Sequence, residues 1–217
     1  MRAHAALLST CLALCLTLPL AASCVKLERQ PVEKRFYALE TARPVTTLAA
    51  GAVTKTAPLT SATLLVRRLH VSPRVAGREL VYRTAPTAWT ADYYNVFFVA
   101  PADMLTQDLR EWLTGAGLCA NVVDPGSLVP ADFILEGNVT SLHGDFAAKP
   151  PQALVEMQFL LLKATGDERQ VLLTREYRKT APLAANTPQE VVRAEREAVA
   201  AVYADLEADL RTALSRK

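Results

Sequence analysis

The chain has few of the residues that build metal, redox or phosphate sites. Its 217 residues include four Cys, three His and eight Gly, and 24 Lys and Arg stand against 22 Asp and Glu. A balanced charge argues against a nucleic-acid binder, which carries a clustered basic excess. The glycines show no phosphate-cradling spacing. Because 51% of the residues are apolar, the chain is too hydrophobic for a disordered segment, and we expect one folded domain.

Catalytic patterns are also missing. His70 and His143 lie at the ends of predicted strands, where a structural or surface role is the ordinary one. No Gly-x-Ser-x-Gly elbow of a hydrolase occurs, and Gly126-Ser127 falls in a proline-flanked loop. Cys119 is the only cysteine after Cys24, too few thiolates for a zinc site in one chain. We therefore predict a protein that is not an enzyme and has neither metal nor cofactor.

The N-terminus predicts export and a lipid anchor. Residues 1–23 contain one charged side chain, Arg2, and their apolar run is shorter than the roughly 20 residues that span a bilayer. Leu20-Ala21-Ala22-Ser23-Cys24 resembles a bacterial lipobox, after which Cys24 would be the first mature residue and carry acyl chains such as palmitate. The alternative is ordinary secretory cleavage after Ser23, leaving Cys24 able to pair with Cys119 in an oxidising periplasm.

The residues after Cys24 suggest where the anchor holds. Val25 is not the Asp typical of inner-membrane retention, so we expect the periplasmic face of the outer membrane. Residues 25–34 are polar and reach about 33 Å when extended. The predicted organisation is a signal peptide at 1–23, a tether at 24–34 and a single domain at 35–217.

Hydrophobic periodicity predicts a mixed β-sheet with helical cover, an α/β or α+β sandwich. The long C-terminal helix has a capping box at Thr187 and Glu190. The helix after Pro101, with the strands beside it, predicts a right-handed crossover. Predicted strands cover 35–40, 63–71, 79–83, 94–100, 118–123, 133–142, 153–162 and 171–178, predicted helices 101–114 and 188–214, and a predicted exposed loop 41–62.

Five aromatic residues within ten positions form the one unusual local composition: Trp89, Tyr93, Tyr94, Phe97 and Phe98. Strand alternation places Tyr94 and Phe98 on one side and Tyr93 and Phe97 on the other. One interpretation is that one face belongs to the core and the other lies under a helix. The second is that Tyr93, Phe97 and neighbouring Trp89 form a surface for a partner protein or an apolar ligand such as a lipid.

Together these features resemble the ABC-type transport auxiliary lipoprotein family, the paraquat-inducible protein C-like lipoproteins of MCE lipid-transport systems. The resemblance rests on Cys24, Phe36-Tyr37-x-Leu39, Leu80-Val81-Tyr82-Arg83, the aromatic strand leading into Pro101-x-x-Met104-Leu105, and the C-terminal helix.

The resemblance implies a non-enzymatic accessory subunit anchored in the outer membrane. Its partners would be a permease, an ATPase and an MCE-domain protein that bridges the periplasm, and its cargo phospholipid or another hydrophobic molecule. A lipopolysaccharide-assembly-like envelope lipoprotein and a soluble periplasmic binding module are the alternatives. Assembly of several copies into a homo-oligomer is a further alternative.

Overall fold

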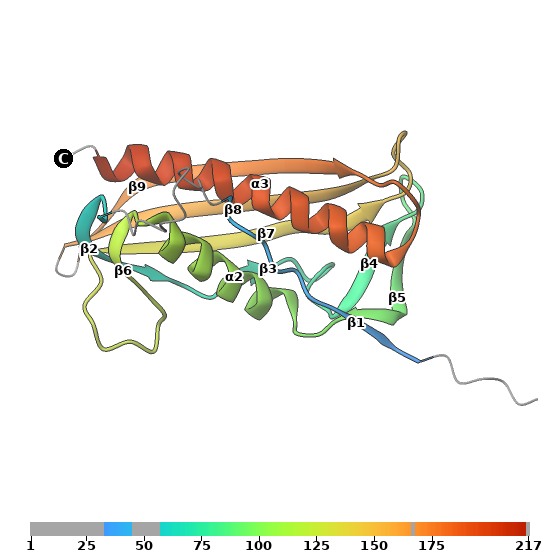
Figure 1. Cartoon of the computed structure of the whole chain (residues 1–217), viewed down its shortest axis with the longest axis horizontal. Coiled ribbons are helices and arrows are strands. Elements are labelled where there is room, and N and C mark those ends of the chain that lie inside the picture. Colours follow the sequence, from blue (N-terminus) through green and yellow to red (C-terminus); the bar gives the residue numbers. More distant parts are fainter. Residues whose placement is uncertain (1–32, 45–56, 166–167, 216–217) are drawn as a thin grey trace, which may run out of the picture. The chain divides into compact units, whose positions relative to one another are not determined.

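One mixed β-sheet carries both described helices on the same face (Figure 1). This computed structural model describes residues 33–44, 57–165 and 168–215. The result is the predicted α+β architecture. The elements are β1 (Arg35–Tyr37), β2 (Thr60–Val66), β3 (His70–Val71), β4 (Glu79–Arg83), β5 (Trp89–Phe97), α2 (Pro101–Ala116), β6 (Cys119–Val123), β7 (Phe133–Asp145), β8 (Gln152–Thr165), β9 (Glu168–Pro182) and α3 (Pro188–Ser215).

The long strand β7 organises the sheet. Along one edge it pairs antiparallel with β8, and β9 continues beyond β8. Its other edge is shared by β2, β3 and β4, which pair in parallel with the first, middle and last residues of β7. β6 lies outside β2, while β5 and then β1 lie outside β4. The sheet therefore divides at β7 into two separate wings, one ending in β6 and the other in β1.

The predicted right-handed crossover around α2 is wrong. Strands β5 and β6 flank this helix in the chain but lie in different wings of the sheet. They also run in opposite directions, because β5 is antiparallel to β4, whereas β4, β7, β2 and β6 are all parallel. α2 instead carries the chain across the sheet from one wing to the other.

The predicted strand at 63–71 is two strands, β2 and β3, with a break at Arg67–Leu69. At the break the backbone N–H of Leu69 donates to Thr106 Oγ1 of α2 at 2.9 Å instead of to a neighbouring strand. The Leu69 side chain fills the space left by Gly137 on β7, where an added Cβ would collide with it. A hydroxyl on the covering helix thus ends the ladder locally.

Both helices begin where the sequence predicts, and each ends one or two residues later than predicted. Pro101 occupies the first turn of α2, and Gly117 closes it in the left-handed conformation at φ 62°, which glycine adopts without a Cβ clash. At the start of α3 the N–H of Glu190 donates to Thr187 Oγ1 at 3.4 Å, one half of the predicted capping box.

The core lies between the sheet and the two helices. On β8 apolar and polar residues alternate: Val155, Met157 and Phe159 are buried beneath α3, whereas Gln158 is exposed on the opposite side. Each such side chain contributes roughly 1.5–3 kcal/mol through burial. Tyr203 of α3 joins the helices: it is fully buried and donates its hydroxyl proton to the Leu105 carbonyl of α2 at 3.1 Å.

The opposite face of the sheet has no helix among the described residues. Polar side chains occupy its centre, where Ser141 donates to Glu156 Oε2 at 2.8 Å and Gln158 lies beside Asn138. Apolar side chains occur toward the two wings. This open face therefore carries the surfaces that are available for contact.

Candidate functional site

A bulge in β5 places two tyrosines on the surface. Leu80 of β4 pairs with Asp92, but the preceding residue, Glu79, pairs with Val96, so residues 93–95 of β5 have no counterpart on β4. The Asp92 carboxylate accepts four hydrogen bonds: from Asn95 Nδ2 at 2.8 Å, from the backbone N–H groups of Tyr94 and Asn95, both at 3.0 Å, and from the Tyr82 hydroxyl at 3.0 Å. These bonds hold the bulge and lower the pKa of Asp92 against the opposing effect of its partial burial.

Exposed aromatic side chains gather around this bulge and the neighbouring edge strand β1. Phe36 of β1 and Phe98 pack edge to face, with ring centroids 6.1 Å apart. Tyr93 and Tyr94 pack in the same way at 5.2 Å. Tyr93 is 64% exposed and Phe98 67% exposed. We call this surface the aromatic edge; its members are Phe36, Tyr93, Tyr94, Phe98 and Val99.

Cationic side chains lie directly over the rings of the aromatic edge. Lys34 Nζ is 3.9 Å from the centroid of the Tyr93 ring, and the Arg78 guanidinium is 5.6 Å from that of Phe36. Arg78 also donates from Nε to the carbonyl of Phe97 at 2.9 Å, which fixes its position. Contacts of this kind contribute about 0.5–1 kcal/mol at exposed sites. The arrangement is an exposed aromatic surface with positive charge above it.

Three of the five predicted contact residues, Tyr93, Tyr94 and Phe98, belong to the aromatic edge. The prediction for Phe97 is wrong: it is 3% exposed and part of the core, because the bulge changes the alternation on which the prediction relied. Trp89 lies apart at the start of β5, where its ring packs against His143 at 4.7 Å and beneath Arg74 at 4.8 Å.

Sequence reasoning missed Phe36 and Val99 as members of this surface. Phe36 is assigned to a strand by its sequence, but its partner in the parallel β1–β5 ladder, Val96, lies about sixty residues further along the chain. The Phe36-Tyr37 pair was a usable signal, because it shows that an aromatic strand directly follows the tether.

A second apolar surface crosses the other wing on the same open face. Register places one side chain from each of β6, β2, β7, β8 and β9 in a continuous row. We call this row the apolar stripe; its members are Val123, Leu65, Ile134, Leu162 and Val171. Ile134 is buried, whereas Val171 is 56% exposed.

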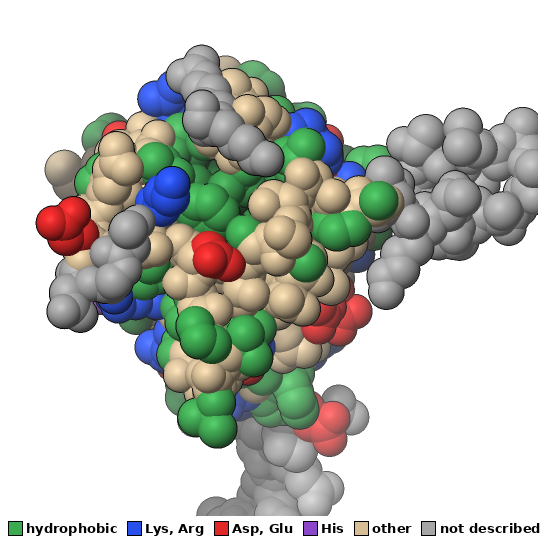
Figure 2. Space-filling model, turned by 90° about the vertical axis from the view of Figure 1, so that its left-hand side faces the viewer, with side chains coloured by type: hydrophobic (Ala, Val, Ile, Leu, Met, Phe, Trp, Pro, Cys, Tyr) green, Lys and Arg blue, Asp and Glu red, His purple; other side chains and the backbone are tan. Residues whose placement is uncertain are grey.

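The end of the domain beside the apolar stripe is hydrophobic as well. Figure 2 looks at the end where β2 and β6 lie, and hydrophobic side chains gather there between scattered charges. Leu128 and Val129, in the loop that follows β6, are both exposed. The wing that ends in β6 therefore offers apolar contact area at some distance from the aromatic edge.

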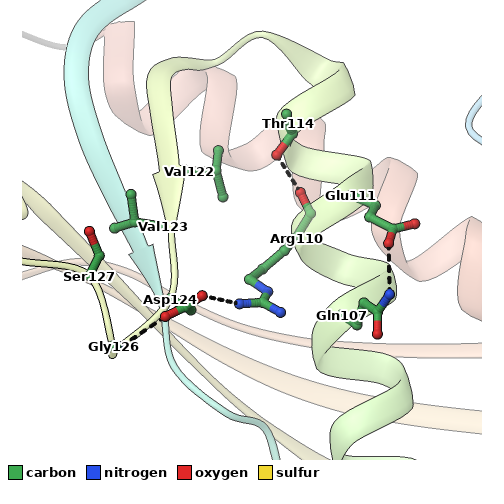
Figure 3. A pocket seen from close by; sticks show the side chains of 9 residues that line it. All are labelled: Gln107, Arg110, Glu111, Thr114, Val122, Val123, Asp124, Gly126 and Ser127. Atoms are coloured by element: carbon green, nitrogen blue, oxygen red, sulfur yellow. Dashed lines mark hydrogen bonds and ion pairs between the residues drawn. The ribbon is translucent and has the colours of Figure 1, made fainter. Parts of the chain in front are cut away.

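A groove of about 810 Å³ lies between α2 and β6 with its following loop (Figure 3). Arg110 of α2 donates to Asp124 Oδ2 at 2.9 Å, and Asp124 Oδ1 accepts the N–H of Gly126 at 2.8 Å. Gln107 and Glu111 are bonded to each other at 3.0 Å. The charged side chains of the groove thus already form hydrogen bonds with one another or with neighbouring polar groups, and the groove is open to solvent. It is poorly suited to hold an apolar ligand, which needs an enclosed, mostly apolar cavity.

Burial shifts the pKa of His143 and of Glu195, two titratable side chains in the described part of the chain. Burial is the main cause that lowers the pKa of His143 to about 4, so its imidazole is neutral, and neither ring nitrogen has a hydrogen-bond partner among the described residues. Burial raises the pKa of Glu195 to about 8. Within the described ranges no three His, Cys, Asp or Glu side chains group as a metal site would require.

The predicted anchor, Cys24, lies outside the described residues. Among the described residues Cys119 is a free, buried thiol, and burial raises its pKa to about 11, so it is neither nucleophilic nor exposed. No helix in the described part of the chain is both long and apolar enough to cross a bilayer.

Comparison with solved structures confirms the fold. A protein from Xanthomonas campestris, XCC0632 of the DUF330 family, is 19% identical, with a TM-score of 0.68 over 82% of this chain and 96% of its own. The structure of an uncharacterized protein is 18% identical, with a TM-score of 0.62 over 82% of this chain and 98% of its own. No curated protein matches the sequence.

The family resemblance is also confirmed. The sequence model of the ABC-type transport auxiliary lipoprotein component matches residues 46–207, which is most of the predicted domain. This match covers strands β2 to β9, α2 and most of α3, whereas β1 precedes it. It agrees with a lipid-anchored envelope protein associated with an ABC transport system. The chain therefore belongs to the family of ABC-type transport auxiliary lipoprotein components.

Proposed function

We propose that this chain is a non-enzymatic accessory subunit of an MCE-type ABC transport system, anchored through Cys24 at the periplasmic face of the outer membrane. The cargo is phospholipid or another hydrophobic molecule. One observation carries the proposal: the open sheet face has two apolar surfaces on opposite wings, and the chain from Cys24 enters beside one of them, the aromatic edge. A domain held there by its N-terminus presents the other, the apolar stripe, to partners.

The interior of the domain supports a docking role rather than a carrier role. The space between sheet and helices is filled by side chains such as Met157, Tyr203 and Leu206, all fully buried. A lipid carrier needs an enclosed apolar cavity of several hundred Å³, whereas the groove beside α2 is polar and open. On this proposal the cargo moves through the MCE-domain protein and the permease, and ATP is hydrolysed on the ATPase.

The chemistry of the described groups supports a role without catalysis. His143 is neutral and packed against Trp89. Glu195 and Cys119 are buried in the core, where a substrate has no access. Contact surfaces, rather than reactive groups, are what this domain offers.

The apolar stripe is the surface we assign to the MCE-domain protein. It lies at the first residues of β7, whereas β4, which carries β5 and β1, pairs with the last residues of that strand. Figure 1 shows β1 and the β2–β6 pair at opposite ends of the sheet. An anchored domain thus turns the stripe away from the end at which the tether enters, toward a bridging protein in the periplasm.

Cross-linking in the native envelope tests the proposal. Val171→Glu places a charge at the exposed end of the stripe, and Thr174→Glu places the same charge on the same strand and face outside the row. We expect an MCE-domain protein and a permease to be captured with the wild type and with Thr174→Glu, but not with Val171→Glu. Capture of lipopolysaccharide or barrel-assembly components instead would contradict the proposal.

The anchor has its own test. If acyl chains on Cys24 hold the protein, Cys24→Ala should release it from the outer-membrane fraction, and the wild-type mature form should carry the mass of the acyl groups. A Cys24→Ala protein that still sediments with the outer membrane, or a wild-type form with a free thiol, would contradict anchoring.

A further inference from the structure

We propose that the aromatic edge rests in the headgroup layer of the same membrane that holds Cys24, so that the domain lies against the bilayer in one orientation. This inference rests on the acyl anchor of the proposed function. It adds a second membrane contact, made by Phe36, Tyr93, Tyr94, Phe98 and Val99, and it names the lipid surface rather than a protein as what covers them.

The path of the chain is the first argument. The described chain reaches the domain at Lys34 and Arg35, where β1 starts beside the bulge of β5. Ten residues separate Cys24 from Arg35, and fully extended they span about 33–36 Å. Among the exposed apolar surfaces of the domain, the aromatic edge is the one that adjoins this attachment point. A short tether therefore brings the aromatic edge to the bilayer before the apolar stripe.

The chemistry of the aromatic edge is the second argument. Tyrosine rings favour the boundary between headgroups and acyl chains, because their body is apolar and their hydroxyl polar. Phe36 and Phe98 add apolar surface that is more than half exposed in the isolated domain. Five large apolar side chains exposed together need a cover, and an interfacial lipid layer provides one without a complementary protein shape.

The charges around the rings agree with a lipid surface. Lys34 and Arg78 lie over the rings of Tyr93 and Phe36, and Arg35 begins the adjoining strand. The long stems of such residues allow the rings to insert while the charges stay at phosphate level. Glu79 on the rim is negative and offsets part of this positive charge. Attraction to lipid phosphates therefore adds little, and the rings supply most of the contact. The Asp92 carboxylate stays negative, but it accepts backbone hydrogen bonds within the bulge, which reduce the cost of removing it from water.

The aromatic edge should therefore fix the orientation of the domain on the membrane and not its attachment to the membrane. Several acyl chains hold a protein on a membrane by themselves, whereas one chain does so only marginally. Loss of the aromatic edge should therefore leave the protein bound but free to tumble on its tether. The experiment must accordingly report which side chains touch lipid, not whether the protein binds.

Tryptophan substitution with brominated lipids makes that measurement. The acylated chain is reconstituted in vesicles of phosphatidylethanolamine and phosphatidylglycerol that carry brominated acyl chains. Phe98→Trp probes the aromatic edge, and Val129→Trp is the matched control at an exposed apolar position on the other wing. For each variant, the emission in excess of that of the wild type is measured in brominated and in unbrominated vesicles. We expect Phe98→Trp to lose about half or more of its added emission and to shift to shorter wavelength, while Val129→Trp changes little.

Each outcome decides the inference. Adding Tyr93→Ser and Phe36→Ser to Phe98→Trp should restore most of the lost emission, and this result supports insertion of the edge as a unit. If the protein floats with the vesicles but neither probe is quenched, or both are quenched equally, the inference is overturned while the anchor stands. If the wild type does not float, the anchor fails and the inference fails with it. Cross-linking of position 98 to a protein in the native envelope also overturns it.

Discussion

Replacing Glu195 by glutamine should make the stability of the domain much less dependent on pH. Glu195 lies on α3, is 1% exposed, and its Oε2 has no hydrogen-bond partner among the described residues. Burial disfavours the charged carboxylate and raises the pKa of Glu195 from an ordinary 4.5 to about 8. At neutral pH the folded protein therefore keeps this carboxyl group protonated, whereas the unfolded chain releases the proton.

The sign and size of the effect follow from linkage. The stabilisation by the protonated form is complete below the unfolded pKa of 4.5 and is lost as the pH rises through the folded pKa of about 8. A difference of about 3.5 pKa units corresponds to at most about 5 kcal/mol of unfolding free energy. Glutamine cannot ionise, so Glu195→Gln should gain stability relative to the wild type across this interval.

Urea unfolding at about pH 5, 6.5 and 8 measures the difference. Near pH 5 the wild type and Glu195→Gln should have similar free energies of unfolding. By pH 8 the variant should unfold at a higher urea concentration, and its free energy of unfolding should exceed that of the wild type by several kcal/mol. Glu197→Gln is the control, since Glu197 lies two residues further along α3, is exposed and pairs with Arg193 at 2.9 Å. Stability curves of the wild type and Glu195→Gln that stay parallel would refute the reasoning.

Three further expectations concern the core and the open face. His143→Leu should make the stability less sensitive to acid. Burial lowers the pKa of His143 from 6.5 to about 4 in the folded protein, so the wild type loses up to about 3 kcal/mol of unfolding free energy as the pH falls between these values. Unchanged acid sensitivity of the variant in urea unfolding would contradict this. Gly144→Ala should cost about 1–3 kcal/mol, because its Cβ would lie 2.9 Å from Val191 Cγ2 on α3. In contrast, Gly115→Ala within α2 should be neutral or stabilising by up to about 1 kcal/mol, and equal thermal shifts in the two variants would contradict the packing argument. Cys119, with its pKa raised to about 11 by burial, should resist iodoacetamide in the native protein at neutral pH and react after unfolding in urea, as mass spectrometry would show; rapid native alkylation would count against its burial.

The helices and the strands β8 and β9 could be predicted because their signals are local. Pro101 and Gly117 mark the ends of α2, and strict alternation around Met157 identifies the packed face of β8. The break between β2 and β3 could not be predicted in this way. It depends on the Thr106 hydroxyl, 37 residues further along the chain, which binds the backbone of Leu69.

The aromatic edge was predicted in part. Tyr93, Tyr94 and Phe98 were found because they are crowded in sequence. Phe97 was misplaced because four donors on one carboxylate, that of Asp92, hold a bulge that reverses strand parity between residues 92 and 96. Phe36 was missed because a parallel pairing brings it to Phe98 across about sixty residues.

The sequence by itself determined both helices, most of the strands, the α+β class and the family, because periodicity, caps and short motifs are properties of neighbouring residues. It also predicts a lipid anchor at Cys24, because the resemblance to a lipobox is a local pattern. Only the tertiary structure decided that both described helices cover one face, that the strands divide into two wings along β7, and that Phe36 meets Phe98. Those outcomes depend on hydrogen bonds and packing between residues far apart in the chain, and such pairings leave no periodic trace in a single sequence.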